Sequence, residues 1–567
     1  MINENGKVAP APWVPFTRAG CDVGAVATAN TVLENTAIDV PTVFGAGSAE
    51  AIQVAADSPG QSATQSFADY IGIGVHCAAG SALCSTANHG KADLLADEPG
   101  GYTGFNGLFG AKYVDPQVFP ATSGTPVDLD GNTIHDQNGH VGFPGFDGME
   151  ATNSLSWVAH MQEAGVPVTY AYISDAHDNH GTSGNIHLAY GPGEAGYTAQ
   201  LAAYDDAFDK FFTRLAGDGI DKTNTLFVFT VDEGDHFAGG DPSPAGCDGV
   251  TTPCTYSQIG EINGDLRRMI RTQFGDTTNF SVHSDDAPNI YVTGNPGRTD
   301  PAVRQLERES AGLSWLNPYT GLVQNDITVA LADPVEEDIL HMVTADPKRT
   351  PTFTLFADPE WFFFATGGAA CATPAACATI PTSATQTFAW NHGDIQDEIA
   401  STWVGYVGPG VQHLGTATPW TDHTDVRPTM LSLLGLVDDY RHDGAVTWGI
   451  LDPSAIPASV SGNQAQVSSL AAAYKQITAS FGDFAMTSLR VSTKALASSS
   501  AGDKTYNLIE TKLANLGAQR DALALQISQL LEGASFSGQA ISSSDASKLL
   551  GKANGLLDKI HELDAEF

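Results

Sequence analysis

The sequence predicts an α/β protein in which a three-layer sandwich surrounds a mainly parallel sheet. Helices and apolar strands alternate from about residue 150, which is typical of a parallel sheet covered on both faces. A cysteine-containing stretch over about 240–390 interrupts this alternation and indicates a long insertion. Beyond about residue 460 the composition shifts to Ala, Ser, Leu and Lys. We therefore expect a main domain over residues 1–460 and a C-terminal helical bundle over residues 461–567.

The alternation consists of segments with distinct hydrophobic periods. Helical periodicity covers four segments: 48–56, 153–164, 197–215 and 427–436. Continuous apolar runs predict strands at 166–174, 226–231 and 401–407, the first two of them buried. Polar residues follow the first two strands directly. In open α/β sheets, ligands gather at the carboxyl ends of strands, so these polar segments are candidate sites.

The insertion and the C-terminal region contain further periodic segments. In the insertion we expect a helix over 262–273, a strand over 289–292 and a core strand at the aromatic run 361–364. In the C-terminal region we expect helices over 464–497, 504–531 and 544–563, the last capped by Ser544-Asp545. Apolar residues lie near helical spacing along the second of these helices: Ile509, Leu513, Leu516, Leu523, Ile527 and Leu530. This region holds only His561 and no histidine clustered with carboxylates, so we assign it no chemistry.

The charge of the chain restricts its partners. Its 65 acidic against 26 basic residues give a net charge of -39 at pH 7, which repels nucleic-acid backbones and anionic lipid. No stretch approaches the roughly 20 apolar residues of a membrane-spanning helix. We therefore expect neither nucleic-acid binding nor a membrane span. An anionic substrate would need a strong local positive charge, and bound metal ions supply one.

Six of the seven cysteines form three local pairs: Cys77 with Cys84, Cys247 with Cys254, and Cys371 with Cys377. None has the C-x-x-C spacing of a zinc ribbon. We therefore expect short-loop disulfides and a secreted or extracytoplasmic protein, with free thiols as the alternative. Cys21 has no such neighbour, and the first residues do not resemble a signal peptide. A missing N-terminal segment would explain both features, although a processed mature protein could also begin this way.

Polar clusters beside the strands combine carboxylates with histidines, the ligand types of catalytic zinc. The first runs from Asp175 to Gly181 and contains His177 and His180. A solvated polar loop is the alternative interpretation. The second, Asp232-Glu233-Gly234-Asp235-His236, follows the strand 226–231. Three carboxylates in five residues repel one another unless a cation balances them, so the second cluster favours a metal site more strongly.

Two weaker candidates come from later in the chain. His423 is the candidate ligand in Thr421 to Asp425, just before the helix 427–436, where Thr424 or Asp425 would serve only as an N-cap. His392 lies in N-H-G-D ahead of the strand 401–407.

Taken together, these clusters resemble the alkaline phosphatase superfamily. Their order is Asp-x(3–4)-His, then Asp and His after the next strand, then a distant His in T-D-H-T-D-V-R-P-T. The stretches N-T-L-F-V-F-T-V-D, V-G-P-G-V at 407–411 and R-P-T-M-L-S-L-L-G-L at 427–436 are also similar to this superfamily. The resemblance covers about residues 100–450. It implies a phosphoric ester hydrolase with two divalent metal ions, most simply Zn, and a small-molecule phosphate ester as substrate.

The resemblance also implies which residues bind the metal ions. By position, the ligands of one ion would be Asp175, His180 and His423. Half of the ligand set of the other would be His236 with Asp232 or Asp235. Two departures leave alternatives open: Asp175 and His180 stand one residue further apart than the usual D-x-x-x-H, so His177 remains a candidate, and the usual adjacent Asp-His pair is D-E-G-D-H here.

The nucleophile that the superfamily uses is not found. It should be a Thr or Ser that begins the helix after the first strand, and neither Thr17 nor Thr28 has this setting. We expect the nucleophile and another Asp ligand in a missing N-terminal segment, and little turnover by these 567 residues alone. The complete site would carry out in-line displacement at phosphorus through a metal-activated hydroxyl.

Other functions and ions fit parts of the pattern. A sulfatase or a phospholipase C-like hydrolase would share the fold, although the C-x-P-x-R motif of sulfatases is absent. A non-catalytic metal-binding surface module is a third hypothesis. Manganese or iron would suit the Asp and His ligands as well as zinc. The loop Asp128 to Asn132 resembles the start of a calcium loop but lacks the later Gly and Glu, so calcium is a further candidate ion.

Overall fold

The computed structural model describes residues 13–19, 23–30, 46–47, 52, 55, 127–134, 150–177, 189–283, 285–325, 327–343, 350–381, 389–437, 440–498 and 502–566. They form a mixed α/β protein with small sheets and a C-terminal helical region. The chain divides into two compact units. Unit 1 comprises Met1–Asp221, Gly239–Gly260 and Pro381–Ala389, and unit 2 comprises Lys222–Ala238, Glu261–Ile380 and Trp390–Phe567. Cys21, the pair Cys77 and Cys84, and most of the expected helix 48–56 lie outside the described residues.

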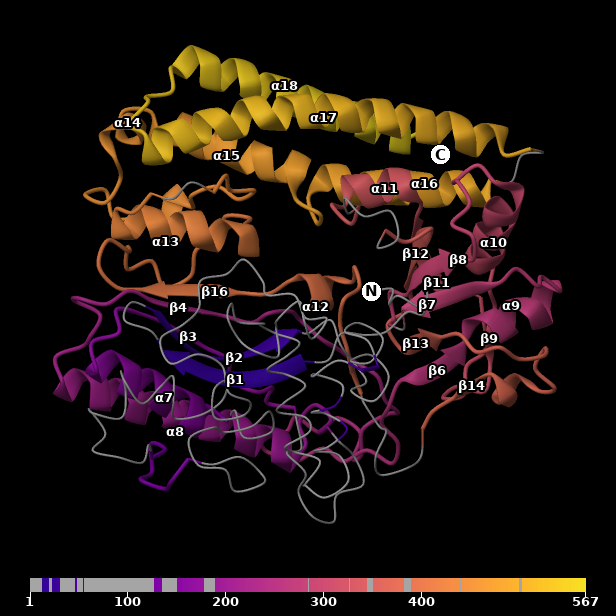
Figure 1. Ribbon diagram of the computed structural model, residues 1–567, viewed down its shortest axis with the longest axis horizontal. Helices are drawn as coiled ribbons and strands as arrows, with labels where there is room; N and C mark the ends of the chain where they lie inside the picture. Colours follow the sequence, from indigo (N-terminus) through magenta and orange to yellow (C-terminus); the bar gives the residue numbers. More distant parts are fainter. Residues whose placement is uncertain are drawn as a thin grey trace. The chain divides into compact units, whose positions relative to one another are not determined.

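The described residues of unit 1 include a three-stranded sheet and the helices α7 (Ala151–Glu163) and α8 (Ala195–Gly217) (Figure 1). Strands β1 (Trp13–Ala19) and β2 (Val23–Asn30) pair antiparallel, and β2 pairs in parallel with β3 (Val168–Ala171). Helices α7 and α8 confirm the two helices predicted here, with ends shifted by one or two residues. The strand predicted at 166–174 is shorter in the structure. It is also not buried as predicted, because Tyr170 in its middle is 55% exposed.

An ion pair joins the two helices of unit 1. The Arg214 guanidinium on α8 donates to both carboxylate oxygens of Glu163 on α7, at 2.6 and 2.7 Å. Burial alone would raise the pKa of Glu163, but the hydrogen bonds from His160 and Arg214 together lower it to about 2. The apolar sides of the same helices bury Trp157, Phe211 and Leu215, so the ion pair lies at the edge of a hydrophobic contact.

Each unit contains one of the predicted short-loop disulfides. In unit 1, Cys247 and Cys254 are bonded with their Cα atoms 5.3 Å apart. In unit 2, Cys371 and Cys377 are bonded with their Cα atoms 5.9 Å apart. Both pairings were predicted from local spacing, and both are confirmed.

Two sheets form the centre of unit 2. The first is antiparallel with strand order β11-β12-β8-β7, and its strands are Thr328–Ala332, Phe353–Ala357, Asn289–Val292 and Phe280–His283. The second has the order β13-β6-β14, and its strands are Trp361–Phe364, Ile262–Asp265 and Ala378–Thr379. The predicted strand 289–292 is confirmed as β8. The predicted core strand 361–364 is confirmed as β13, in which the side chains of Trp361 and Phe363 are fully buried.

The helix predicted over 262–273 is wrong in its first turn. Residues 262–265 form β6, and helix α9 (Leu266–Phe274) begins only after it. The Asp265 carboxylate accepts a hydrogen bond from the backbone N–H of Arg268 and so marks the start of the helix. The parallel pairing of β6 with β13 therefore outweighs the helical periodicity of these four residues.

Two short antiparallel pairs complete the part of unit 2 that precedes the bundle. Strands β4 (Phe227–Thr230) and β16 (Val404–Val407) confirm the predicted strands 226–231 and 401–407, and they pair with each other. The first was also predicted to be buried, which is wrong, because only Phe227 of β4 is buried and Thr230 is exposed. Strand β5 (His236–Phe237) pairs with β15 (Trp390–Asn391). Other short elements of unit 2 are α10 (Pro301–Ala311), β9 (Trp315–Leu316), β10 (Val323–Gln324), α11 (Pro334–Ile339), η2 (Pro374–Ala376), α12 (Asp397–Ala400), η3 (His423–Asp425), α13 (Val426–Leu434) and η4 (Trp448–Ile450).

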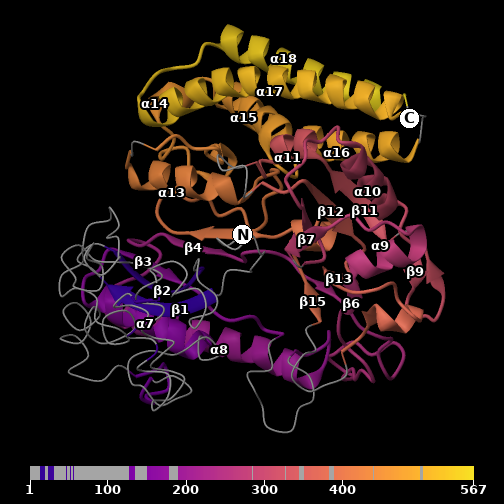
Figure 2. The ribbon, with the colours of Figure 1, turned by 45° about the vertical axis from the view of Figure 1, so that its right-hand side comes forward.

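The C-terminal helices form the predicted bundle, in which α15, α17 and α18 lie side by side (Figure 2). The helices are α14 (Ala458–Ser461), α15 (Gln464–Thr478), α16 (Asp483–Ala497), α17 (Lys504–Phe536) and α18 (Ser543–Asp564). Of the predicted apolar residues of α17, four are buried and Leu516 and Leu530 pack partly buried against the same core. The cap of α18 is Ser542 and not the predicted Ser544-Asp545.

The single helix predicted over 464–497 is two helices in the structure. The chain turns at Gly482, where an added Cβ would lie 2.7 Å from the Lys475 carbonyl oxygen and 2.9 Å from that of Ala479. Only glycine allows the backbone to pass so closely. The break was missed because apolar periodicity continues on both sides of it.

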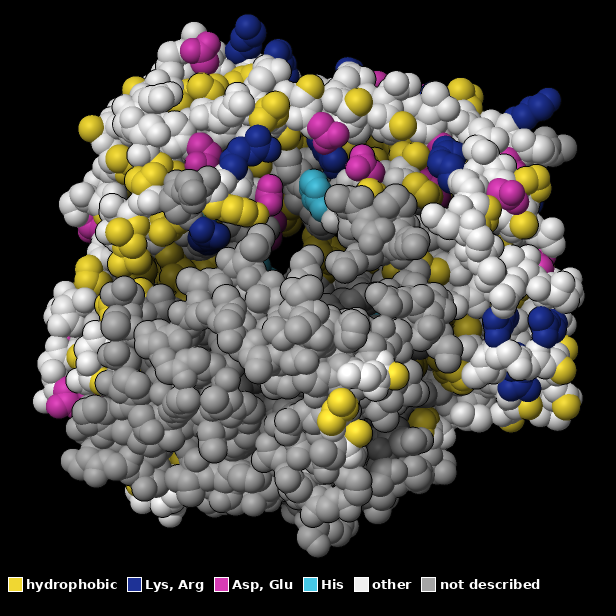
Figure 3. Space-filling view, in the orientation of Figure 1, with side chains coloured by type: hydrophobic (Ala, Val, Ile, Leu, Met, Phe, Trp, Pro, Cys, Tyr) yellow, Lys and Arg dark blue, Asp and Glu magenta, His cyan; other side chains and the backbone are white. Residues whose placement is uncertain are grey.

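In the view of Figure 3, acidic and basic side chains are interspersed on the surface of the bundle. None of the described helices combines the length and the apolar character needed to cross a membrane.

Candidate metal centre

The second predicted cluster, Asp232 to His236, follows β4, and its glycine determines how closely its backbone approaches a neighbouring segment. Gly234 donates its backbone N–H to the Ile399 carbonyl oxygen at 3.0 Å. A Cβ at this position would lie 2.2 Å from the carbonyl oxygen of Glu398. The glycine in D-E-G-D-H therefore lets this loop lie against the α12 segment, and the approach brings the next residues of the loop to the Glu398 side chain.

The two ring nitrogens of His236 differ, because one has a hydrogen-bond partner and the other has none. Its Nδ1 lies 3.0 Å from Glu398 Oε1, and its Nε2 is buried without a hydrogen-bond partner. Hydrogen bonds from its own backbone amide and from His236 lower the pKa of Glu398, so this side chain is a carboxylate at neutral pH. A carboxylate that holds Nδ1–H leaves the lone pair of Nε2 for a metal ion, which is the usual arrangement around metal-binding histidines.

His392 balances the charge of the same loop. Its Nδ1 lies 3.4 Å from Asp235 Oδ1 and its Nε2 lies 3.3 Å from Glu233 Oε1. The hydrogen bond with Asp235, together with the charge of Glu233, raises the pKa of His392 to about 9. An imidazolium has no lone pair for a metal ion. Without a bound ion, His392 is a counter-charge to the two carboxylates, and its role as a ligand stays a prediction.

Further carboxylates lie near the His392 loop. Burial, and then the charge of Asp285, raise the pKa of Glu261 to about 7. Burial likewise raises the pKa of Asp394 to about 7 and that of Asp286 to about 10, with Asp285 adding to both. Burial is the larger cause of all three shifts, and the negative charge of Asp285 adds to it. A bound metal ion would relieve this repulsion.

His423 lies at the end of β4. Its Nε2 is 2.7 Å from the Val231 carbonyl oxygen and 3.1 Å from Thr230 Oγ1. The Thr230 hydroxyl in turn donates to the Trp403 carbonyl oxygen of the neighbouring segment at 2.6 Å. His423 is thus brought next to the peptide that precedes Asp232, although the two are far apart in the sequence. Because Nε2 of His423 contacts the Val231 carbonyl oxygen, Nδ1 is the ring nitrogen that remains to bind a cation.

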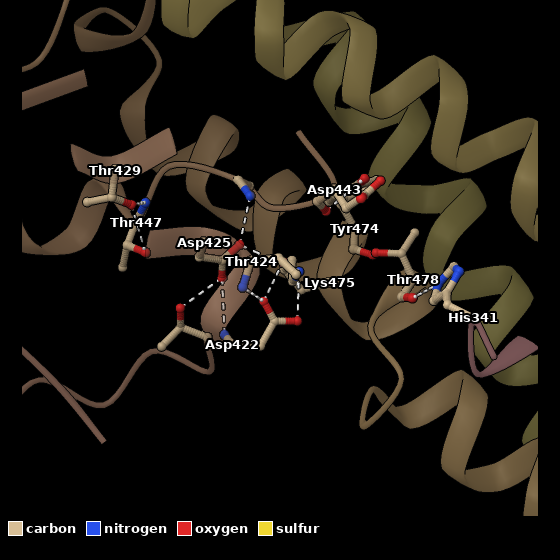
Figure 4. Close-up of polar contacts among 12 residues, drawn as sticks. His341, Asp422, Thr424, Asp425, Thr429, Asp443, Thr447, Tyr474, Lys475 and Thr478 are labelled. Carbon is tan, nitrogen blue, oxygen red and sulfur yellow. Dashed lines mark hydrogen bonds and ion pairs between the residues drawn. The ribbon is translucent and has the colours of Figure 1, made fainter. Parts of the chain in front are cut away.

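A buried lysine holds the turn that carries His423 (Figure 4). Lys475 of α15 lies 2.8 Å from both Asp422 Oδ2 and Thr424 Oγ1, and its Nζ is 3.5 Å from Asp425 Oδ1. Asp425 is buried and also accepts hydrogen bonds from the Thr421 hydroxyl and the Ala445 amide. These contacts join the predicted T-D-H-T-D motif to the C-terminal bundle.

Thr424 or Asp425 was predicted as the N-cap of the helix 427–436, and Asp425 takes the N-cap position of α13, although its side chain makes no capping hydrogen bond to that helix. Asp422 accepts from the Thr424 amide at 3.0 Å and caps the η3 turn. Asp425 accepts from the Asp422 amide at 3.3 Å and completes the capping box. Thr424 is not the cap.

The first predicted cluster belongs to unit 1. Its Asp175 and His177 lie close together, with His177 Nε2 3.9 Å from Asp175 Oδ2. His180 lies outside the described residues. The joint role of Asp175, His180 and His423 that the resemblance implies therefore stays a prediction.

The loop at Asp128 has the contacts of a tight turn. Asp128 Oδ1 accepts from the amides of Asp130 and Asn132, both at 2.8 Å. Asp130 is paired with Lys210 at 2.6 Å. Both carboxylates thus have protein partners, and nothing in the geometry adds support to calcium binding there.

Two features of the site were missed from the sequence. Glu398 and Lys475 lie in segments without a metal-ligand pattern, and only the folded chain brings them to His236 and to Asp425. A buried group formed by Asp333, Glu336 and Glu510 was also missed. In the described part of unit 2, this is the one group of three or more potential ligands with one ligand atom each within 4.8 Å of the others, and it contains none of the predicted ligands.

Comparison of the chain with protein-family models and with curated protein sequences found no match.

Proposed function

We propose that the protein is a metal-dependent hydrolase of phosphate esters, with a metal centre at the end of β4. The observation that carries this proposal is the state of His236. Its Nδ1 is fixed by Glu398, and its buried Nε2 has no hydrogen-bond partner. An unsatisfied buried nitrogen costs free energy, and a metal ion at Nε2 would remove that cost.

The neighbouring side chains suit a divalent cation. Asp232 and Asp235 lie on the same loop as His236 and supply carboxylate oxygens, and His423 supplies an imidazole at the end of β4. Imidazole nitrogen with carboxylate oxygen is a ligand set that zinc accepts, and manganese or iron also accept it. We assign His236 and either Asp232 or Asp235 to one ion. The resemblance to the alkaline phosphatase superfamily assigns the second ion, with Asp175 and His180 among its ligands.

The chemistry of such a centre is Lewis acidity: a bound divalent ion polarises a phosphoryl oxygen and lowers the pKa of a coordinated hydroxyl. The residues of this chain would prepare that chemistry. Glu398 keeps the proton on Nδ1 of His236, and so keeps Nε2 available. Lys475 holds the turn of His423. His392 offsets the charge of Glu233 and Asp235 and so limits their mutual repulsion.

The same resemblance carries our proposal for the fold, a mainly parallel sheet with helices on both faces. It is supported by the parallel pairing of β2 with β3 and by the contacts that α7 makes with both strands. The disulfides in both units support our proposal that the protein is secreted.

A substrate panel tests the proposed function. The natural protein would be freed of metal ions with a chelator and reloaded with Zn²⁺ or Mn²⁺. Its activity would then be assayed with p-nitrophenyl phosphate, bis(p-nitrophenyl) phosphate and p-nitrophenyl sulfate. We expect metal-dependent hydrolysis of a phosphate ester, lost in His236→Ala and kept in His413→Ala, which removes an exposed histidine of unit 2. Faster hydrolysis of the sulfate would replace our proposal with a sulfatase. Metal binding without hydrolysis of any substrate would replace it with a non-catalytic metal-binding module.

A further inference from the structure

Three carboxylates meet in the interior of unit 2, away from the metal centre at β4. Asp333 and Glu336 lie at the start of α11, and Glu510 lies on α17. One oxygen of each lies within 4.8 Å of the other two, and all three side chains are at most 1% exposed. Carboxylates so close and so deeply buried repel one another strongly unless a positive charge lies between them.

In each carboxylate, one oxygen is used by the fold and the other is not. Asp333 Oδ1 accepts from the Val335 amide at 2.8 Å, and Glu336 Oε2 accepts from the Asp333 amide at 3.2 Å, which forms the capping box of α11. Glu510 Oε1 accepts from the Ser492 hydroxyl at 2.9 Å. The remaining oxygens, Asp333 Oδ2, Glu336 Oε1 and Glu510 Oε2, are buried without a hydrogen bond. Asp333 Oδ2 and Glu510 Oε2 still lie within ion-pair distance of arginines, whereas Glu336 Oε1 has neither a hydrogen bond nor an arginine contact within the described residues. The fold thus orients the three side chains and leaves Glu336 Oε1 unsatisfied.

The nearby arginines compensate only part of the negative charge. Arg298 lies 3.7 Å from Asp333 and 4.0 Å from Glu510, and Arg304 lies 3.6 Å from Asp333. Arg304 is itself paired closely with the buried Glu307. Four carboxylates therefore face two guanidinium groups, and two negative charges are left over. A single divalent cation would make this group neutral.

The neighbouring Glu337 is not part of this group. It is buried, and its Oε1 accepts a hydrogen bond from the Thr354 hydroxyl at 3.1 Å.

We propose that Asp333, Glu336 and Glu510 bind one divalent cation that fastens the C-terminal bundle to the preceding part of unit 2. The ligands are all carboxylate oxygens, which favour the hard ions Ca²⁺, Mg²⁺ and Mn²⁺ over zinc. The cation would connect α11 with α17, two elements from distant parts of the sequence that already pack together. Its role is structural, because the site is closed to solvent.

The alternative to a cation is a proton shared between carboxylates. Burial, with the charges of Glu510 and Asp333, raises the pKa of Glu336 well above its ordinary value. Two protons would also remove the two excess negative charges. The two explanations differ in what glutamine does, because glutamine replaces a protonated glutamate well but supplies no charge to bind a cation.

The test is the melting temperature of the whole chain after unfolding and refolding with a chelator or with Ca²⁺, Mg²⁺ or Mn²⁺. We expect one of these ions to bind at one equivalent per chain, measured by elemental analysis, and to raise the melting temperature. At an ion concentration of 100 times its Kd, the ratio of folded to unfolded chain should rise about 100-fold. If none of the three ions binds and stabilises the refolded protein, the proposal is wrong.

Single substitutions test whether the ion binds at these three carboxylates. Glu510→Gln and Glu336→Gln should each abolish the rise, whereas Asp558→Asn, which removes an exposed carboxylate of the same bundle, should keep it. His236→Ala should also keep it, which separates this site from the catalytic centre proposed above. A rise that survives both glutamine variants would place the ion elsewhere. Glutamine variants that are more stable than the wild type, with no effect of any ion, would establish the shared proton instead.

Discussion

Glu398 Oε1 lies 3.0 Å from Nδ1 of His236, and this contact determines which imidazole nitrogen remains for a ligand. The two residues come from distant segments, which meet because β5 pairs with β15 and because Gly234 lets the backbone of its loop lie against that of Glu398 and Ile399. The Glu398 carboxylate is half exposed, so its main effect on His236 is to orient the ring and to fix the position of its proton.

Replacing Glu398 should weaken metal binding without removing a ligand. In Glu398→Gln the amide can hydrogen-bond to the imidazole but no longer stabilises the Nδ1–H form by charge. We expect the affinity for Zn²⁺ to fall about 10–100-fold, as is typical when the carboxylate partner of a metal-binding histidine is changed. Isothermal titration with Zn²⁺ measures this. Asp397→Asn is the matched control, because Asp397 is the exposed neighbour with the same charge. Equal losses in both variants would mean that net charge, and not the His236 contact, controls affinity.

Replacing Gly234 should move the loop that carries the proposed ligands. The Cβ of Gly234→Ala would meet the Glu398 carbonyl oxygen at 2.2 Å, so the two segments must separate. We expect a loss of about 1–3 kcal/mol in the free energy of unfolding, and a weaker affinity for Zn²⁺ as well. Urea unfolding and Zn²⁺ titration of the same preparation measure the two effects. Gly462→Ala changes a glycine of unit 2 that has a right-handed helical backbone and whose Cβ would meet nothing within 4 Å, so its stability and its affinity for Zn²⁺ should be unchanged. Unchanged stability in Gly234→Ala would contradict the close approach.

Lys475 should be important for stability because its partners are buried acids. Lys475→Met removes the charge beside Asp422 and the buried Asp425 and leaves Asp425 uncompensated. Breaking a buried ion pair from one side typically costs about 3–5 kcal/mol, which urea unfolding would detect. Adding Asp425→Asn to this variant should restore part of the loss. The exposed pair of Lys494 with Asp564 is the comparison, and Lys494→Met should cost only about 0–1 kcal/mol. No recovery in the double variant would mean that Lys475 acts by packing alone.

The pKa of Glu163 predicts how acid affects unit 1. Its folded-state pKa of about 2 is below the ordinary value of 4.5, so its contribution to stability is present above about pH 4.5 and lost as the pH falls towards 2. Glu163→Gln should therefore be less stable than the wild type at pH 7, and the difference should shrink between pH 4.5 and 2. Urea unfolding of both proteins across this range measures the effect. Asp205→Asn, an exposed acid on α8, should show no such convergence. A constant difference between Glu163→Gln and the wild type at all pH values would contradict the ion pair with Arg214.

The sequence predicted an element correctly where the local hydrophobic pattern alone decided its structure. The predicted helices of α7, α8 and α17 and the strands β4, β8 and β13 are present, and so are two of the three disulfides; the third lies outside the described residues. Errors arose where tertiary packing decided the local structure. Residues 262–265 became a strand through pairing with β13, and Gly482 divided a periodic segment into two helices.

The candidate ligands can be named from the sequence, whereas the residues that contact them cannot. Asp232, Asp235, His236 and His423 stand out in the sequence because carboxylates and histidines follow strands. Glu398 and Lys475 carry no such pattern, and their roles depend on contacts between distant segments. Asp333 and Glu336 fit an ordinary helix-capping motif in the sequence, so only the approach of Glu510 reveals a cluster.

X-ray absorption at the zinc K-edge tests the central claim most directly, because it reports the atoms bound to the metal at the end of β4. We predict nitrogen and oxygen ligands at about 2.0–2.2 Å in the zinc-loaded protein, with one nitrogen lost or the zinc no longer retained in His236→Ala. His413→Ala should leave the spectrum unchanged. A zinc environment in His236→Ala that is identical to that of the wild type would contradict the assignment of Nε2 as a ligand, and with it the metal centre on which the proposed hydrolase rests.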